Sequence, residues 1–140
     1  MADELTLIKQ LTIPVSVIVA DATAIAKGTV MKIADPATFS ASVAASDICG
    51  GVSLVEKIAS DGTTQLAVCM GPGDWFKATA SGSITVGDAL ATSGGGTPNR
   101  LVSFPGTLLS GAKVIGDSLE TATDGQTFLF RLNMQQGPRT

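Results

Sequence analysis

Two stretches decide the fold class of this chain: GVSLVEKIASDGTTQLAVCM (51–70) and GDSLETATDGQTFLFRLN (116–133). Each places an Asp-Gly pair, at 61–62 and at 124–125, between two runs rich in apolar and β-branched residues. Tight hairpin turns need positive φ at their central residues, which Gly and Asp tolerate, so each stretch predicts a β-hairpin. In the second return strand, Phe128, Phe130 and Leu132 fall on one face and Arg131 on the other, which is typical of a strand with one buried face.

Short runs of the same kind extend outward from these hairpins. They predict further strands at 12–19, 29–33, 74–79, 101–104 and 113–120. The alanine-rich connection 35–46 has room for one helical turn, and long 3.6-residue periodicity is missing elsewhere. The fold class expected is therefore mainly β, a small antiparallel β-sandwich or barrel.

The two halves of the chain repeat one order of turn, strand, long loop, strand, Asp-Gly pair and strand. Equivalent turn residues are offset by 59 (28 and 87), 65 (51 and 116) and 63 (61 and 124). We interpret this as two similar β units, at about 13–80 and 81–133, which close a single core within one domain, 13–133. The alternative is chance, because Gly, Asp and Thr are common in all β turns. A short N-terminal arm (1–12) and a flexible tail (134–140) are expected to flank the domain.

The first hairpin also predicts a register. If residues 61 and 62 are the two central turn residues, cross-strand partners sum to 123, so Leu54 faces Cys69 and Cys49 faces residue 74. The two cysteines are then not opposed, and we expect free buried thiols in place of a disulfide.

Composition excludes several classes of function. The 140 residues include no His, no Tyr and one Trp, with a net charge of −3. Imidazole catalysis, most zinc sites, aromatic stacking platforms and a basic nucleic-acid surface are therefore not expected. The Asp-Gly pairs are turn chemistry, and the glycines at 94–96 lack the Lys and Ser/Thr of a phosphate loop. We predict no enzyme activity, no cofactor and no metal.

The small residues Ala, Gly, Ser and Thr account for 62 of the 140 positions, which favours burial of further apolar surface against neighbouring subunits. No stretch is long and apolar enough to span a membrane. The apolar run 11–20 is a poor signal peptide, since Asp3 and Glu4 precede it against the single Lys9.

Two groups of residues are candidates for subunit or capsid contact. The N-terminal segment carries Leu5, Leu7, Ile8 and Leu11 before the first clear strand, and ten residues cannot form a core of their own. We expect an arm that adds as a strand to a partner, and the alternative is docking on its own body. The second group is Trp75 and Phe76, which as strand neighbours point to opposite faces. Either one enters the core and the other meets a partner, or both are buried between sheets.

Three segments carry a resemblance to a known family: ITVGDAL (84–90), VIGDSLE (114–120) and DGQTFLFRLN (124–133). They resemble the capsid cement, or head decoration, proteins of tailed bacteriophages, and the likeness covers roughly 13–133. The longer loops 35–47 and 94–111 and the N-terminal segment depart from the family pattern.

The resemblance implies a structural virion protein that is made in the host cytoplasm. It would bind the outer surface of the capsid, with the major capsid protein as partner, as a homotrimer that stabilises the shell. It implies no catalytic residue, cofactor, nucleic acid or membrane. The alternative is a β-sandwich module that binds a carbohydrate or a host surface, which would need several exposed aromatic residues where this chain has Trp75 and five Phe.

Overall fold

A computed structural model describes residues 3–34, 38–43, 48–94, 99–103 and 114–133. The described residues form eleven short strands and no helix, so the expected mainly β class is confirmed. In chain order the strands are β1 (Thr6–Lys9), β2 (Val15–Val19), β3 (Val30–Ala34), β4 (Thr38–Ala41), β5 (Cys49–Ser53), β6 (Gln65–Cys69), β7 (Trp75–Thr79), β8 (Ala89–Thr92), β9 (Leu101–Ser103), β10 (Gly116–Ser118) and β11 (Thr127–Leu132).

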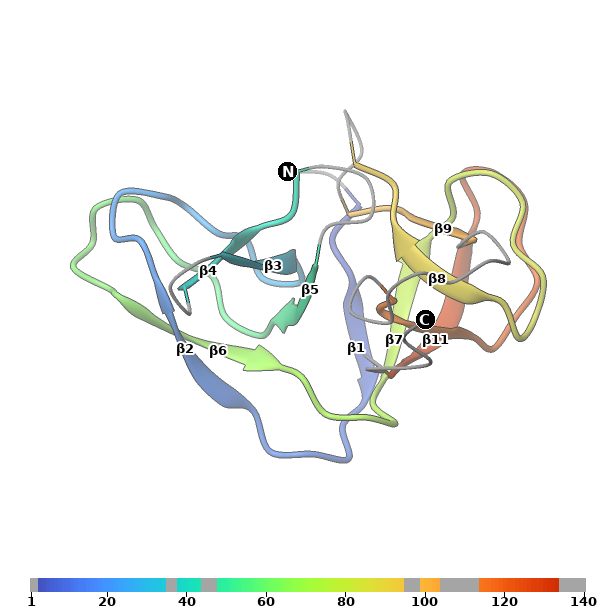
Figure 1. Cartoon of the computed structure of the whole chain (residues 1–140), viewed down its shortest axis with the longest axis horizontal. Helices are drawn as coiled ribbons and strands as arrows, with labels where there is room; N and C mark the ends of the chain where they lie inside the picture. Colours follow the sequence, from blue (N-terminus) through green and yellow to red (C-terminus); the bar gives the residue numbers. More distant parts are fainter. Residues whose placement is uncertain (1–2, 35–37, 44–47, 95–98, 104–113, 134–140) are drawn as a thin grey trace.

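The strands make two layers that lie side by side (Figure 1). Strands β2-β4-β3-β5-β6 close into a barrel, and β1-β7-β11-β10-β8-β9 form a six-stranded sheet. All pairs are antiparallel except β2 with β4, and β1 is the end strand of the sheet nearest the barrel.

The strand order contains two similar units, and the second unit begins with β7 (Trp75–Thr79), ahead of the boundary at 80/81 that the sequence suggested. The barrel order β2-β6-β5-β3-β4 is repeated in the sheet as β7-β11-β10-β8-β9, and a parallel bridge from Ala80 to Leu101 returns β9 to the end of β7. Bridge Ile25–Lys57 is repeated at Ile84–Ala122, with the offsets of 59 and 65. The Gly28 N–H donates a hydrogen bond of 2.9 Å to the Ser53 carbonyl, and the equivalent bond of the second unit runs from the Gly87 N–H to the Ser118 carbonyl at 2.8 Å.

The buried apolar residues form two clusters, whereas the sequence suggested a single core. The smaller cluster fills the barrel with residues such as Val17, Met31 and Val68. The larger cluster lies between the layers and draws on both units, since Val30 packs there with Phe76. A buried hydrogen bond of 3.0 Å from the Val30 N–H to Asn99 Oδ1 also crosses between the units.

The register predicted for the first hairpin is wrong. Val52 pairs with Cys69 and Ser53 with Val68, so partners sum to 121 and residue 54 lies beyond the strand. The Asp61-Gly62 pair is not a two-residue turn: it lies within a longer loop in which Asp61 Oδ1 accepts a bond of 2.9 Å from the Thr63 N–H.

One other detail differs from the expectations, and one agrees with them. Part of the 35–46 connection, expected to hold a helical turn, forms strand β4, because its residues pair with both β2 and β3 and complete the barrel. Cys49 and Cys69 are both buried free thiols, as predicted.

Candidate interaction surfaces

The N-terminal segment lies against its own chain. Strand β1 pairs with β7 in antiparallel register, with Thr6 opposite Lys77 and Leu7 opposite Phe76. Leu5 is buried in the larger core cluster, and Leu7 packs against that cluster. The segment therefore docks on its own body, the alternative to a free arm, because β7 provides the strand partner and the inter-layer core accepts the two leucines.

Two further contacts anchor this segment. The Leu5 N–H donates to the Gly28 carbonyl at 2.8 Å, and Asp3 forms an ion pair with Arg100 at 2.9 Å. Gly28 has a φ of +84°, and a Cβ there would lie 2.2 Å from the Leu5 carbonyl oxygen. The barrel thus approaches the N-terminal segment so closely that only glycine fits at the contact.

Not all the candidate residues share this environment. Phe76 belongs to the core, whereas Ile8 and Leu11 are exposed and Trp75 is half-buried on the outer face of the sheet. The amino group of Lys9 lies over the Trp75 ring, 4.5 Å from its centroid. The structure therefore divides the six candidates between the core and the surface, and their contact with a partner stays a prediction.

An exposed apolar segment leads from β1 into β2. Ile8, Leu11, Ile13 and Val15 all face solvent, and Ile13 is 87% exposed. Leu11 lies against the neighbouring β6–β7 connection, since a Cβ on Gly73 would meet its side chain at 3.3 Å. The two connections between barrel and sheet run together along the lower edge in Figure 1. Four exposed large apolar side chains therefore lie within the eight residues 8–15 along this edge.

Buried Asp74 holds the two connections together. Its Oδ1 accepts bonds from the Leu11 N–H at 2.5 Å and the Thr12 N–H at 3.1 Å. Its Oδ2 accepts from Thr12 Oγ1 at 2.8 Å and from Cys69 Sγ at 2.6 Å. Sequence reasoning missed this site, because its partners lie up to 63 positions away along the chain.

These contacts shift the pKa of both titratable groups. Burial acts to raise the pKa of Asp74, but the bonds from Cys69, Leu11 and Thr12 outweigh it and the net pKa is lowered from 3.8. Burial, with the neighbouring Asp74 carboxylate, raises the pKa of Cys69 to about 12. Asp74 is therefore ionised and Cys69 protonated at neutral pH.

A buried lysine organises the barrel end. The Lys57 amino group donates to the carbonyls of Asp21 (2.5 Å), Thr23 (3.0 Å) and Ile58 (3.2 Å). Two carboxylates, of Asp21 and Asp61, lie within 4 Å of the same nitrogen. The internal repeat could have indicated from the sequence that this lysine is unusual. Lys57 is equivalent to Ala122 of the second unit, and both positions are buried.

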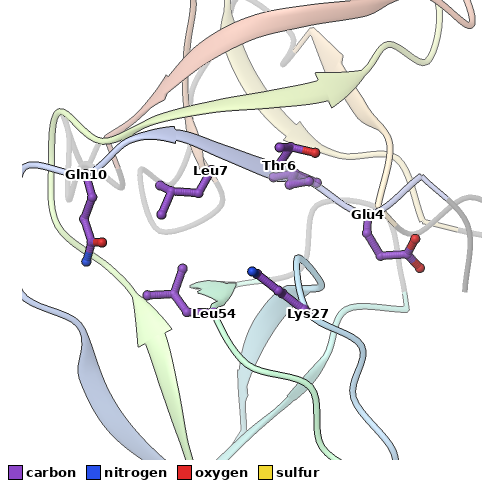
Figure 2. A pocket seen from close by; sticks show the side chains of 7 residues that line it. Glu4, Thr6, Leu7, Gln10, Lys27 and Leu54 are labelled. Atoms are coloured by element: carbon purple, nitrogen blue, oxygen red, sulfur yellow. The ribbon is translucent and has the colours of Figure 1, made fainter.

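A cleft separates β1 from the barrel (Figure 2). Its volume is about 690 Å³, and its lining includes Leu7 and Gln10 from the N-terminal segment and Lys27 and Leu54 from the barrel. The side chains of Leu7 and Leu54 point toward each other across it, and the Lys27 amino group points toward the space between them. Lys27 and Leu54 are functional candidates that sequence reasoning did not single out, since their approach to β1 depends on how the two layers pack.

Among the described residues, no group of three or more His, Cys, Asp or Glu side chains is placed to hold a metal ion. The same part of the chain contains no helix long and apolar enough to cross a membrane.

The comparisons with known proteins bear on the fold. No protein-family model and no curated protein matches the sequence. Among solved structures, the chain is similar to the N base of head fiber gp8.5 of bacteriophage phi29, with a TM-score of 0.54 and 17% sequence identity. The match covers 91% of this chain and 98% of that chain. At this identity the likeness shows a shared fold, and it agrees with the resemblance to phage head proteins that the sequence motifs indicate.

Proposed function

We propose that this chain is a structural virion protein that binds the outer surface of a phage capsid and stabilises the shell. The observation that carries the proposal is the fold shared with the base of a phage head fiber along almost the whole of both chains. The motifs at 84–90, 114–120 and 124–133 point independently to the same class of protein. The proposed partner is the major capsid protein, and the proposed role is non-enzymatic, with synthesis in the host cytoplasm.

The construction of the molecule supports a passive binding role. The two units share one inter-layer core, and hydrogen bonds at Asp74 and Asn99 fix their relative placement. A rigid body loses little conformational freedom on binding, and many identical weak contacts on a lattice add by multivalency. The net charge of −3 suits a shell exterior, where no contact with the genome is needed.

We also propose that the protein acts as a homotrimer. The exposed apolar side chains of Leu11, Ile13 and Val15 give one edge of the molecule surface that association would bury. Light scattering at high protein concentration should give three times the 14.1 kDa of one chain. A particle of 14.1 kDa, both free and on the shell, would contradict the trimer.

The alternative, a module that binds carbohydrate, gains no support from the described residues. Phe76, Phe128 and Phe130 are buried, and the half-buried Trp75 is already covered by Lys9. A sugar-binding face would need exposed rings beyond this one.

Co-sedimentation tests the proposed function. Shells assembled from the major capsid protein encoded in the same genome are mixed with the purified chain and pelleted. The proposal expects saturable binding in a fixed ratio to capsid subunits and a higher disruption temperature of the loaded shells. Recovery of the chain only in the supernatant would contradict it.

A further inference from the structure

Among the strands that the structure describes, none pairs with the second edge of β1. Strand β1 pairs with β7 on one side, and its other side faces the cleft. The Leu5 N–H points to this cleft side, where it meets the Gly28 carbonyl. Backbone groups of an extended chain alternate between its two edges, so the N–H and C=O of Leu7 are directed to the same side as those of Leu5.

The barrel contacts this edge through the backbone hydrogen bond between Leu5 and Gly28 and then leads away from it. Gly28 takes the place of a neighbouring strand at Leu5, after which the chain turns into β3 and away from β1. Beyond Leu5, the cleft is lined on this side by Thr6, Leu7 and Gln10. The four residues from Leu7 to Gln10 span about 13 Å at about 3.3 Å per residue. The cleft volume of about 690 Å³ lies within the range of ordinary ligand pockets, about 300–1,000 Å³.

We propose that this edge binds an extended segment of the capsid protein, which adds to the six-stranded sheet as one further strand. The proposal rests on the proposed function and names the surface that performs it. Main-chain bonds to β1 would supply affinity, and alternate side chains of the guest would supply specificity. One apolar side chain fits between Leu7 and Leu54, and an acidic side chain of the same segment meets the Lys27 amino group.

The sheet topology argues against the other end of the sheet in a second copy of this chain as the guest. The strand at that end, β9 (Leu101–Ser103), is already bridged back to Ala80, at the end of β7. A guest segment with an acidic residue beside an apolar one matches the cleft better.

The test compares two substitutions at one position. Leu7→Pro removes the N–H that faces the cleft and leaves the bonds between Thr6 and β7 in place, whereas Leu7→Ala shortens the same side chain and keeps that N–H. Lys27→Glu reverses the charge at the cleft, with Lys77→Glu, an exposed lysine on β7, as its control. We expect Leu7→Pro to bind shells at least tenfold more weakly than Leu7→Ala. Lys27→Glu should weaken binding several-fold, and Lys77→Glu should leave it unchanged.

The outcomes separate the two proposals. If the unmodified chain binds shells and the Leu7→Pro and Lys27→Glu proteins bind equally well, the edge proposal is overturned and the proposed function stands. If the unmodified chain does not bind shells, the proposed function fails, and the proposal that the β1 edge binds a capsid segment fails with it.

A second measurement uses a probe peptide and no shells. The probe is an acetylated and amidated heptapeptide of alternating threonine and valine with a central glutamate. It should slow hydrogen exchange of the Leu7 amide in the full chain. Unchanged exchange at millimolar peptide would overturn the edge proposal.

Discussion

A matched pair of glycines tests how the N-terminal segment is held. Gly28 and Gly87 occupy the same turn in the two units, with φ of +84° and +90°. Each donates its N–H across the unit, to Ser53 at 2.9 Å and to Ser118 at 2.8 Å. They differ in their surroundings: a Cβ at position 28 would lie 2.2 Å from the Leu5 carbonyl oxygen, whereas a Cβ at position 87 would meet nothing within 4 Å.

The magnitude of the difference follows from these contacts. Alanine in a left-handed conformation costs about 1–2 kcal/mol, and both substitutions carry that cost. At Gly28 the clash with backbone must also displace β1. That movement breaks the Leu5–Gly28 hydrogen bond, worth about 0.5–1.5 kcal/mol, and exposes the buried Leu5 side chain, worth about 1.5–3 kcal/mol. Gly28→Ala should therefore destabilise the protein by about 2–4.5 kcal/mol more than Gly87→Ala.

Urea denaturation of the two variants and the unmodified chain measures this difference, and hydrogen exchange locates it. In the Gly28→Ala protein the amides of β1 should exchange faster, while those of β10 and β11 keep their protection. Equal free energies of unfolding for the two variants, within about 0.5 kcal/mol, would refute the close docking of the N-terminal segment.

Three further predictions concern buried polar groups. Asp74→Asn should cost about 1–3 kcal/mol near neutral pH. Because the folded-state pKa of Asp74 is lowered, its stabilisation is present above the unfolded pKa and lost as pH falls through the folded value. The deficit in denaturation midpoint should therefore shrink on acidification, and a constant deficit would contradict this. Glu56→Gln, at an exposed carboxylate, serves as the control. Lys57→Met should lower the free energy of unfolding by about 2–4 kcal/mol, because three carbonyls lose their donor. Lys77→Met should change it by no more than about 0.5 kcal/mol, and equal effects of the two would contradict the role of Lys57. Thiol titration of the denatured, unreduced protein should find two thiols per chain, and alkylation of native Cys69 near pH 8 should be slow because its pKa is raised to about 12; rapid native labelling would contradict its burial.

Local sequence patterns predicted two kinds of feature: strands with a clear pattern of apolar residues, and positions that recur in both units. Alternation of apolar residues placed β11 at 127–132 as observed, and the offsets of 59 and 65 located equivalent bridges in the two units. The expectation of separate faces for Trp75 and Phe76 followed from strand geometry, and the structure places them so.

Features that depend on long-range packing were not predictable in this way. β4 pairs with strands on both sides, so its partners outweigh the alanine-rich local sequence. The register of the first hairpin failed because a longer loop, held by the Ile25–Lys57 bridge, replaces a two-residue turn. The Asp74 contacts and the cleft beside Lys27 join segments that no local pattern relates.

A cryo-EM comparison of shells with and without the protein tests the central claim most directly. The account predicts added density on the outer surface of the loaded shells, at symmetry-related positions, into which the barrel and the six-stranded sheet fit as one body. Density on the inner surface, or identical maps at saturating protein, would contradict a role as a structural protein of the capsid exterior.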